Sequence, residues 1–582
     1  MLKNIRSFFY KYKKYQQPLE KYLFPVVLIL YPLIGVNAGV DITDTTYSLA
    51  NYEFIGSIDP MWLLSTFISN IVGNGIMKLP GAGTMLGFGI YCSLIISIIA
   101  IISYYSLKEY MPGWMIFIGI IISESLCWCP RVILYNYLTY LFMTAGILLL
   151  LKGIFSWKRQ TLYLFCAGLA LGLNVMVRFP NVTETAFILI LWFYSFLTKE
   201  NLMQAVKKTI VCICGYLVGF GIPFAAISFI YGKNAYFDMI GSLFGMTSKA
   251  SDYTAGGMLS VIIETYVDTG SKMLIFIPCI AAGMIMFSLY EHKYISVKKV
   301  LYVMGLMVLI KFFFSRGILT RNYYYYDSIF QIAMMLVILS LIIAVIGSTG
   351  FLNGSRQEQT LSFTIIIIVL ITPLGSNNYT FPVLNNLFVV LPLALWLFRR
   401  LMQRLGDRSI NFPWQSMITV VIAITLIQGA LFHMNFSFVD GADGAKRDSV
   451  STSVEKIKYM VTTEENVRSL EELNDYLISG NKIGSKALLF GQVPGLAYIF
   501  DLRPAIDTVW PDLDSYTAER FAERLEEISE SDEPEVMIIC GKNIPEYSNI
   551  EAKYDILLDY IANRDYNIDF ESDKFIVYTV GK

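Results

Sequence analysis

The chain has 582 residues, of which 55% are hydrophobic and only 16% are charged, and its mean hydropathy is +0.54. Soluble proteins carry roughly 25% charged residues, so this composition excludes an ordinary soluble enzyme. The basic residues are spread over short segments and form no stripe, which argues against nucleic acid as a partner. Two histidines leave almost no material for a histidine-rich metal site.

The charges divide the chain into two parts. Residues 1–439 contain 17 acids and 30 bases, whereas residues 440–582 contain 29 acids and 15 bases. We therefore predict a transmembrane domain over 1–439 and a separate, acidic, water-soluble domain over 440–582. Helical and strand patterns alternate through the second part, which predicts an α/β fold for it.

Apolar runs of the length that crosses a bilayer recur along the first part. They predict a polytopic α-helical membrane protein with about thirteen transmembrane helices, at roughly 22–38, 83–105, 113–128, 132–151, 161–177, 183–198, 209–231, 271–290, 300–315, 325–347, 361–373, 383–398 and 414–432. An odd number of spans places the two ends of the chain on opposite sides of the membrane.

The distribution of lysine and arginine fixes the expected orientation. With the amino terminus inside, 21 basic residues fall on the inner side, eight fall on the outer side and one lies within a span. Because basic residues concentrate in cytoplasmic loops, we predict a cytoplasmic amino terminus in the cell membrane and an extracellular carboxy-terminal domain.

Two of the predicted outer loops are long, at residues 39–82 and 232–270. The first contains an apolar but interrupted helical stretch over 58–72 that suits the membrane interface. The second contains a helix-like stretch over 258–267. Loops of this length are uncommon unless they are functional or disordered, so both are candidates for covering a site beside the membrane.

A pair of acids stands where the first apolar run ends. Asp41 and Asp44 are followed by Tyr47, and all three lie on the predicted outer side. Carboxylates beside hydrocarbon are costly and usually have a task or a partner. We predict that Asp44 is a catalytic base, that Asp41 supports it and that Tyr47 contacts substrate. The alternative interpretation is a hydrated loop that caps the helix end.

Four arginines lie on the same predicted side: Arg131, Arg178, Arg316 and Arg321. A guanidinium binds a phosphate through two parallel hydrogen bonds, so these residues are the candidates for a donor phosphate, with Arg178 favoured because a Pro180 turn follows it. Snorkelling to the membrane surface is the alternative. Tyr324 and Asn377, in polar outer turns, are candidate substrate contacts, although an interfacial aromatic belt also explains the tyrosine.

These features together resemble the GT-C glycosyltransferases, such as protein O-mannosyltransferases and lipid A aminoarabinose transferases. The shared features are an acid pair after the first helix, a long first outer loop with an interfacial helix, about a dozen further helices and an outward carboxy-terminal domain. Such enzymes carry an acidic pair before an aromatic residue in the first outer loop. Asp44-Thr45-Thr46-Tyr47 matches the aspartate and approximately the tyrosine, while Thr45 replaces the second acid.

The resemblance implies a membrane glycosyltransferase, a hexosyl- or pentosyltransferase of the cell envelope. It would move a sugar from a polyprenyl-phosphate donor to a glycan, lipid or protein acceptor on the outer face, among membrane lipids. We expect no cofactor; a divalent metal stays open and is not favoured. The alternatives are a polysaccharide polymerase or ligase, a lipid-linked-sugar transporter or flippase, and a non-catalytic scaffold. A transporter is disfavoured because no internal repeat is evident.

Overall fold

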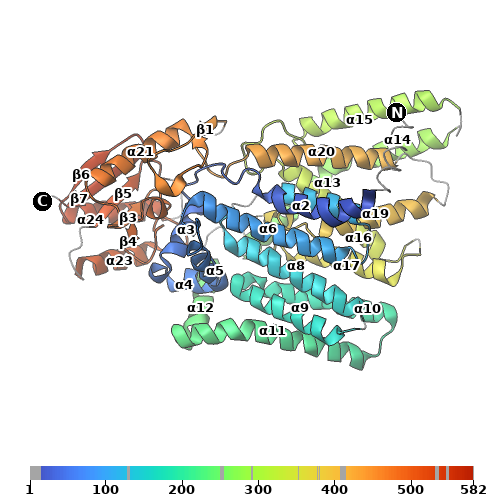
Figure 1. Ribbon diagram of the computed structural model, residues 1–582, viewed down its shortest axis with the longest axis horizontal. Helices are drawn as coiled ribbons and strands as arrows, with labels where there is room; N and C mark the ends of the chain where they lie inside the picture. Colours follow the sequence, from blue (N-terminus) through green and yellow to red (C-terminus); the bar gives the residue numbers. More distant parts are fainter. Residues whose placement is uncertain are drawn as a thin grey trace.

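The computed structural model describes residues 15–127, 131–156, 158–248, 255–289, 293–351, 353–376, 378, 380–406, 414–442, 444–530, 536–544 and 549–580. The protein consists of a long bundle of helices and a sheet-containing carboxy-terminal domain that packs against one end of the bundle (Figure 1). The helices α3, α4 and α5 lie between the two parts. The fold therefore places the segment around Asp44 at the junction between the bundle and the domain.

Within the described residues, eight helical stretches are long and apolar enough to cross a membrane. This supports a multi-pass membrane protein, whereas the predicted count of about thirteen spans is not confirmed. The eight stretches are α6 (Met85–Leu107), α8 (Leu134–Phe155), α9 (Gln160–Val177), η4 (Phe179–Phe187) joined to α10 (Ile188–Thr198), α11 (Leu202–Ile230), α13 (Ala255–Met273) joined to α14 (Phe276–Ser288), α16 (Phe330–Ser348) and α20 (Trp414–Asn435).

The remaining predicted spans also form helices, but shorter or more polar ones. They are η1 (Leu19–Leu23), α2 (Phe24–Leu30) and η2 (Tyr31–Leu33) in the first run, then α7 (Gly113–Leu126), α15 (Ile295–Ser315), α17 (Arg356–Ile371) and α19 (Val390–Gly406). A four-residue helix, α18 (Phe381–Leu384), precedes α19. Each apolar run of the sequence therefore corresponds to helical structure, with ends shifted by several residues.

Glycines bring two membrane helices into close contact. Gly168 and Gly172 of α9 face Gly215 and Gly219 of α11, and a Cβ on Gly168 would lie 1.9 Å from the backbone oxygen of Cys212. Small residues four positions apart allow helix backbones to approach within a bilayer, where packing rather than the hydrophobic effect drives association. The α9–α11 pair thus depends on these glycines.

The start of α17 is fixed by a capping box. The Ser355 hydroxyl accepts a hydrogen bond from the Glu358 backbone N–H at 3.2 Å, and the Glu358 carboxylate accepts one from the Ser355 N–H at 2.9 Å. The same carboxylate pairs with Arg400 Nε at 2.7 Å and with Arg404. These contacts join α17 to the arginine-rich end of α19.

The first outer loop is mostly helical. It contains α3 (Asp44–Glu53), η3 (Ile55–Ser57), α4 (Pro60–Ser65) and α5 (Phe67–Met77). The predicted helical stretch over 58–72 is therefore two helices, the first begun by Asp59, whose side chain accepts from the Met61 N–H at 2.6 Å. The second long loop, predicted over 232–270, contains α12 (Ala235–Ser248) and most of α13. α13 extends a few residues past the predicted end of the loop and is followed by the apolar helix α14.

The carboxy-terminal domain is built on a five-stranded sheet with the order β4-β3-β5-β7-β6. Its strands are β3 (Lys486–Phe490), β4 (Arg503–Pro504), β5 (Met537–Gly541), β6 (Tyr566–Glu571) and β7 (Phe575–Val580), and its helices are α21 (Glu464–Ser479), α22 (Leu496–Ile499), α23 (Ala518–Glu530) and α24 (Ile550–Asn563). β4, β3 and β5 are parallel, and β7 and β6 are antiparallel additions. A two-stranded ribbon, β1 (Arg447–Ser449) with β2 (Thr462–Thr463), and η5 (Glu455–Ile457) precede it.

Alternate side chains of the central strands face opposite layers, as the strand period requires. Leu488 and Phe490 of β3 belong to one apolar cluster together with residues of α23 and α24. Ala487 and Leu489 belong to the larger cluster that includes α21 and continues into the helical bundle. The central strands β3 and β5 are buried on both faces, and one apolar core runs from the bundle into the domain.

Candidate functional site

The segment from Asp41 to Tyr47 is organised by the Asp41 carboxylate. Its oxygens accept hydrogen bonds from the backbone N–H of Thr43 and of Thr45, both at 2.7 Å, and from the Thr43 hydroxyl. Asp41 is only 2% exposed. A carboxylate that accepts from these N–H groups satisfies the first donors of a helix and favours its positive end. Asp41 therefore caps α3, which begins at Asp44.

Asp44 has a different environment. It occupies the first turn of α3 and is partly exposed, and its pKa is raised to about 7, first by burial and then by the negative charge of Asp41. Burial likewise raises the pKa of Asp41, while the hydrogen bonds from Thr43 and Thr45 oppose that shift. A carboxyl group that titrates near neutral pH can exchange a proton at physiological pH.

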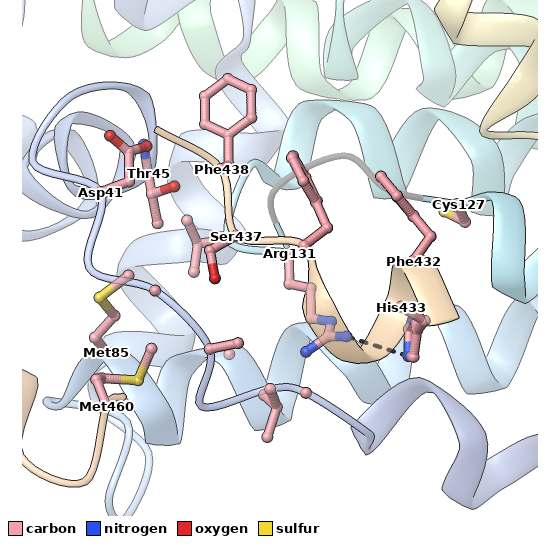
Figure 2. A pocket seen from close by; sticks show the side chains of 17 residues that line it. Asp41, Thr45, Met85, Cys127, Arg131, Phe432, His433, Ser437, Phe438 and Met460 are labelled. Carbon is pink, nitrogen blue, oxygen red and sulfur yellow. Dashed lines mark hydrogen bonds between the residues drawn. The ribbon is translucent and has the colours of Figure 1, made fainter. Parts of the chain in front are cut away.

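A cavity of about 100 Å³ lies beside this segment. Asp41 and Thr45 line one side, Arg131 and His433 line the opposite side, and Ser437 lies between them (Figure 2). The lining comes from the first outer loop, from the segment between α7 and α8, and from the end of α20. Residues that are far apart in the sequence thus meet at one place. Asp44 is not among the lining residues.

The Arg131 guanidinium is held by neutral groups. Its Nη2 donates to the backbone oxygen of Ile34 at 2.7 Å and lies 3.3 Å from His433 Nε2. Because a guanidinium only donates, the His433 nitrogen must accept in this contact, so that ring is neutral. The ring stacks on Tyr31 at 5.2 Å. Loss of hydration lowers the pKa of Arg131 below its ordinary value.

In the described parts of the chain, no carboxylate lies within ion-pair distance of Arg131. A cation that is partly removed from water without an anionic partner is unfavourable unless an anion can join it. The cavity wall opposite Arg131 carries the Asp41 carboxylate, but that group is already engaged by three donors. The free side of the cavity is therefore suited to a small anionic group.

The other three predicted arginines do not reach this cavity. Arg178 donates to the Gly375 backbone oxygen at 3.0 Å and lines a separate small pocket with Glu184. Arg321 lines a wide, open cavity with Lys311 near the carboxy-terminal end of α15, and its guanidinium stacks over the Phe314 ring at 5.4 Å. Arg316 is exposed and lies over the Phe312 ring. Of the four arginines, only Arg131 lines the cavity beside Asp41.

The predicted aromatic and amide contacts are also dispersed. Tyr47 packs edge-on against Trp510 of the carboxy-terminal domain, with ring centroids 5.2 Å apart. Tyr324 is 40% exposed and lies under the guanidinium of Arg447, 5.9 Å away. Asn377 lies outside the described residues. Neither tyrosine lines the cavity, so substrate contact by Tyr47, Tyr324 and Asn377 remains a prediction.

Sequence reasoning did not single out His433 and Ser437. Both lie at the outer end of the last apolar run, on the same predicted side as Asp41, and that position was a usable signal. Across the part of the chain that the structure describes, no three histidine, cysteine, aspartate or glutamate side chains are grouped as a metal site requires. A metal requirement remains an open prediction.

Comparison with known proteins gives only distant likenesses. No protein-family model and no curated protein matches the chain. Among solved structures, the oligosaccharyltransferase AglB from Archaeoglobus fulgidus in complex with an inhibitory peptide and a dolichol-phosphate matches with a TM-score of 0.46 and 12% identity, covering 97% of this chain and 76% of that one. The oligosaccharyltransferase of the same archaeon in its apo form matches with a TM-score of 0.46 and 11% identity, covering 98% and 75%.

A third structure, of that oligosaccharyltransferase tethered to an acceptor peptide, matches with a TM-score of 0.45 and 12% identity, covering 98% of this chain and 74% of that one. These neighbours are membrane glycosyltransferases of the GT-C fold, the class that the sequence resembles. A structural similarity this low gives no information about the site, so the roles of the site residues are inferred from this chain alone.

Proposed function

We propose that this protein is a membrane glycosyltransferase that moves a sugar from a polyprenyl-phosphate-linked donor to an acceptor on the outer face of the membrane. The observation that supports the proposal is the cavity that Asp41 and Arg131 line from opposite sides (Figure 2). Asp41 caps the helix that begins at Asp44, whose pKa burial and the Asp41 charge raise to about 7, and Arg131 has no acidic partner among the described residues.

In the proposed reaction, an acceptor hydroxyl oxygen attacks the anomeric carbon of the donor sugar. The bond between that carbon and the phosphate oxygen breaks, and the phosphate leaves with the bonding electron pair. The hydroxyl proton passes to the Asp44 carboxylate, which acts as general base. Asp41 holds the start of α3 in place through its hydrogen bonds.

Arg131 is the residue that we assign to the donor phosphate. A preorganised cation in a site with little water stabilises the charge that develops on a leaving phosphate. This assignment replaces Arg178 as the first choice, because Arg178 lines another pocket, away from the Asp41–Asp44 segment. Arg178, Arg321 and Arg316 remain candidates for other parts of the donor. The sugar, hexose or pentose, and the acceptor, whether glycan, lipid or protein, are left open.

The test is sugar transfer from a polyprenyl-phosphate donor by the purified full-length protein, with a thermal melt of each variant. Asp44→Asn should lower the rate by about 10²- to 10⁴-fold, the usual contribution of a general base. Arg131→Ala should raise the donor KM and lower kcat, and Arg131→Lys should restore only part of the loss, since lysine cannot make the two-point contact.

Matched controls come from the exposed outer ion pair Asp268–Lys272, whose atoms lie 2.7 Å apart. Asp268→Asn and Lys272→Ala each change one outward charge away from the cavity and should transfer at the wild-type rate. Wild-type transfer by folded Asp44→Asn and Arg131→Ala would exclude the proposed roles of both residues.

A further inference from the structure

The turn between β3 and α22 of the carboxy-terminal domain, residues 491–495, touches the acidic segment of the first outer loop. The Gly495 backbone N–H donates to the Ile42 backbone oxygen at 2.9 Å. A Cβ on Gly495 would lie 1.7 Å from the Thr46 hydroxyl oxygen and 2.6 Å from the Ile42 oxygen. Because φ at Gly495 is −70°, any residue could adopt this backbone, so glycine is needed here for space.

The hydroxyl that Gly495 approaches is itself bonded to the acid pair. Thr46 is fully buried, and its Oγ1 donates to the Asp41 backbone oxygen at 2.7 Å. A side chain at position 495 would therefore push directly on the hydroxyl that fastens α3 to Asp41. The contact links the domain to the capped start of the helix that carries Asp44.

A second contact lies one residue further along α3. Trp510, which is 4% exposed, packs edge-on against Tyr47 with ring centroids 5.2 Å apart and an interplanar angle of 71°. Trp510 belongs to the loop between β4 and α23. The domain thus contacts both the turn before α3 and the first turn of the helix.

The domain also holds the chain on the other side of the acid pair. The Asp440 carboxylate accepts from the Val40 N–H at 3.1 Å and from Asn466 Nδ2 at 2.8 Å, and it pairs with Arg447 Nε at 3.0 Å. Its side chain is 0% exposed. Asp440 thereby anchors the residue that precedes Asp41. The Gly39 N–H donates to the Val461 oxygen and the Val461 N–H donates to the Asn37 oxygen, both at 2.7 Å, which extends this contact.

We propose that the carboxy-terminal domain forms one side of the catalytic site. There it positions the Asp41–Asp44 segment and shields this segment from water. Gly495, Trp510 and Asp440 are positioning residues in this scheme, because they act through the acidic segment. The inference depends on the proposed function, since it assigns a role in the same reaction. The competing explanation is an interface that only joins two stable parts of the chain.

The charge environment of Asp44 follows from this packing. Asp41 is the charged group that acts on it. Of the segments packed against α3, α5 carries no ionisable side chain and α22 carries Tyr498, which is bonded to the Gly83 oxygen at 2.9 Å. The loop that contains Trp510 carries Asp507, Asp512 and Asp514. The Asp507 carboxylate pairs with Arg520 at 2.6 Å, and the Asp512 carboxylate accepts from the Gln492 N–H at 2.9 Å. At the far end of α3, Glu53 pairs with Lys456 of the domain at 2.6 Å. The domain therefore acts on Asp44 mainly by excluding water.

The test compares Gly495→Ala with a matched control, Gly480→Ala. Gly480 lies in the same domain at φ −84°, and the nearest atoms to a Cβ there belong to the flexible Lys482 side chain, at 3.0 Å and beyond. Each purified full-length variant is melted, and its transfer rate is measured at pH 6 and pH 8. Trp510→Leu, which keeps an apolar side chain of smaller volume, is measured in parallel as a second perturbation of the contact between the domain and α3.

We expect Gly495→Ala to lower kcat by roughly 10- to 100-fold, since a displacement of about 1 Å in a catalytic group can cost 10² in rate. Hydration of the segment should also move the pKa of Asp44 down toward its ordinary value. The ratio of the rate at pH 6 to that at pH 8 should therefore rise from about 0.1 to near 1, whereas Gly480→Ala keeps the wild-type ratio. A change in folding alone would not move this ratio.

Wild-type kcat and a wild-type pH ratio in a folded Gly495→Ala variant would overturn the inference. If Gly495→Ala does not melt cooperatively, the result for Trp510→Leu decides by the same criteria. The two proposals fail in different ways. An active Asp44→Asn variant would refute the proposed role of Asp44 as general base. An inactive Asp44→Asn variant, together with a wild-type pH profile in Gly495→Ala, would refute only the proposed role of the domain.

Discussion

The pKa of Asp44 makes the pH dependence of the reaction predictable. With a pKa of about 7, roughly 10% of this carboxyl is ionised at pH 6, half at pH 7 and about 90% at pH 8. A general base works only when deprotonated, so kcat/KM should rise nearly tenfold from pH 6 to pH 8 and then level. A carboxyl at its ordinary value of 3.8 would be ionised throughout this range and would give a flat profile.

Asp41→Asn tests the origin of this shift. The negative charge of Asp41 is the second cause of the raised pKa, after burial, so removing it should shift the profile to lower pH without abolishing the shift. The variant also replaces one acceptor of the Thr43 and Thr45 N–H groups by an amide, which should cost about 1 kcal/mol of stability. The rate on the plateau should fall much less than in Asp44→Asn.

The assay is initial-rate transfer at limiting acceptor between pH 5.5 and 8.5, since kcat/KM reports the free enzyme. Asp268→Asn provides the control for a change in outward charge. A flat wild-type profile, combined with an inactive but folded Asp44→Asn variant, would refute the reasoning, because Asp44 would then act with an unshifted pKa. An unchanged profile in Asp41→Asn would refute the coupling between the two carboxylates.

The remaining predictions concern stability and topology. Glu358→Ala should lower the melting temperature, because it removes one half of the capping box of α17 and leaves Arg400 and Arg404 without their anion, at a cost of roughly 1–3 kcal/mol after allowance for their exposure; an unchanged melt would contradict it. Gly172→Leu should prevent stable packing of α9 on α11, whereas Gly221→Ala, which has no atom within 4 Å, should be tolerated. Asn567→Cys in exposed β6 should react with an impermeant thiol reagent on intact cells, and protection until lysis would reverse the predicted orientation.

Local patterns predicted the elements well, because length and hydropathy act locally. The alternating helical and strand patterns expected over 440–582 are present, for example as helices α21 and α24 and strands β3 and β7. β6 was missed because most of its side chains are exposed. It pairs along the edge of the sheet through its backbone, so its sequence shows little apolar alternation. The glycine pairs of α9 and α11 were a readable signal that was overlooked.

Local sequence patterns could not show which distant residues meet in the folded protein. Arg131, His433 and Asp41 come from three segments that are far apart in the sequence, and nothing in the local sequence of Arg131 marks it as a cavity residue. The proline turn made Arg178 the more attractive candidate, yet that turn directs it to Gly375. Likewise, the close packing of Gly495 could not be inferred from the turn itself, because its partner, Thr46, lies more than 400 residues away in the sequence.

The two carboxylates of the first outer loop have separate tasks because their surroundings differ. Asp41 is saturated with donors and serves the geometry of α3, so it has little capacity left to take a proton from an acceptor. Asp44 accepts none of those bonds, and burial together with the neighbouring charge keeps its proton affinity near neutrality. Environments that differentiate paired acids are the usual means by which acid and base roles are assigned. With Arg131 across the cavity to receive an anion, the charge that leaves with the phosphate and the proton that leaves the acceptor have separate destinations.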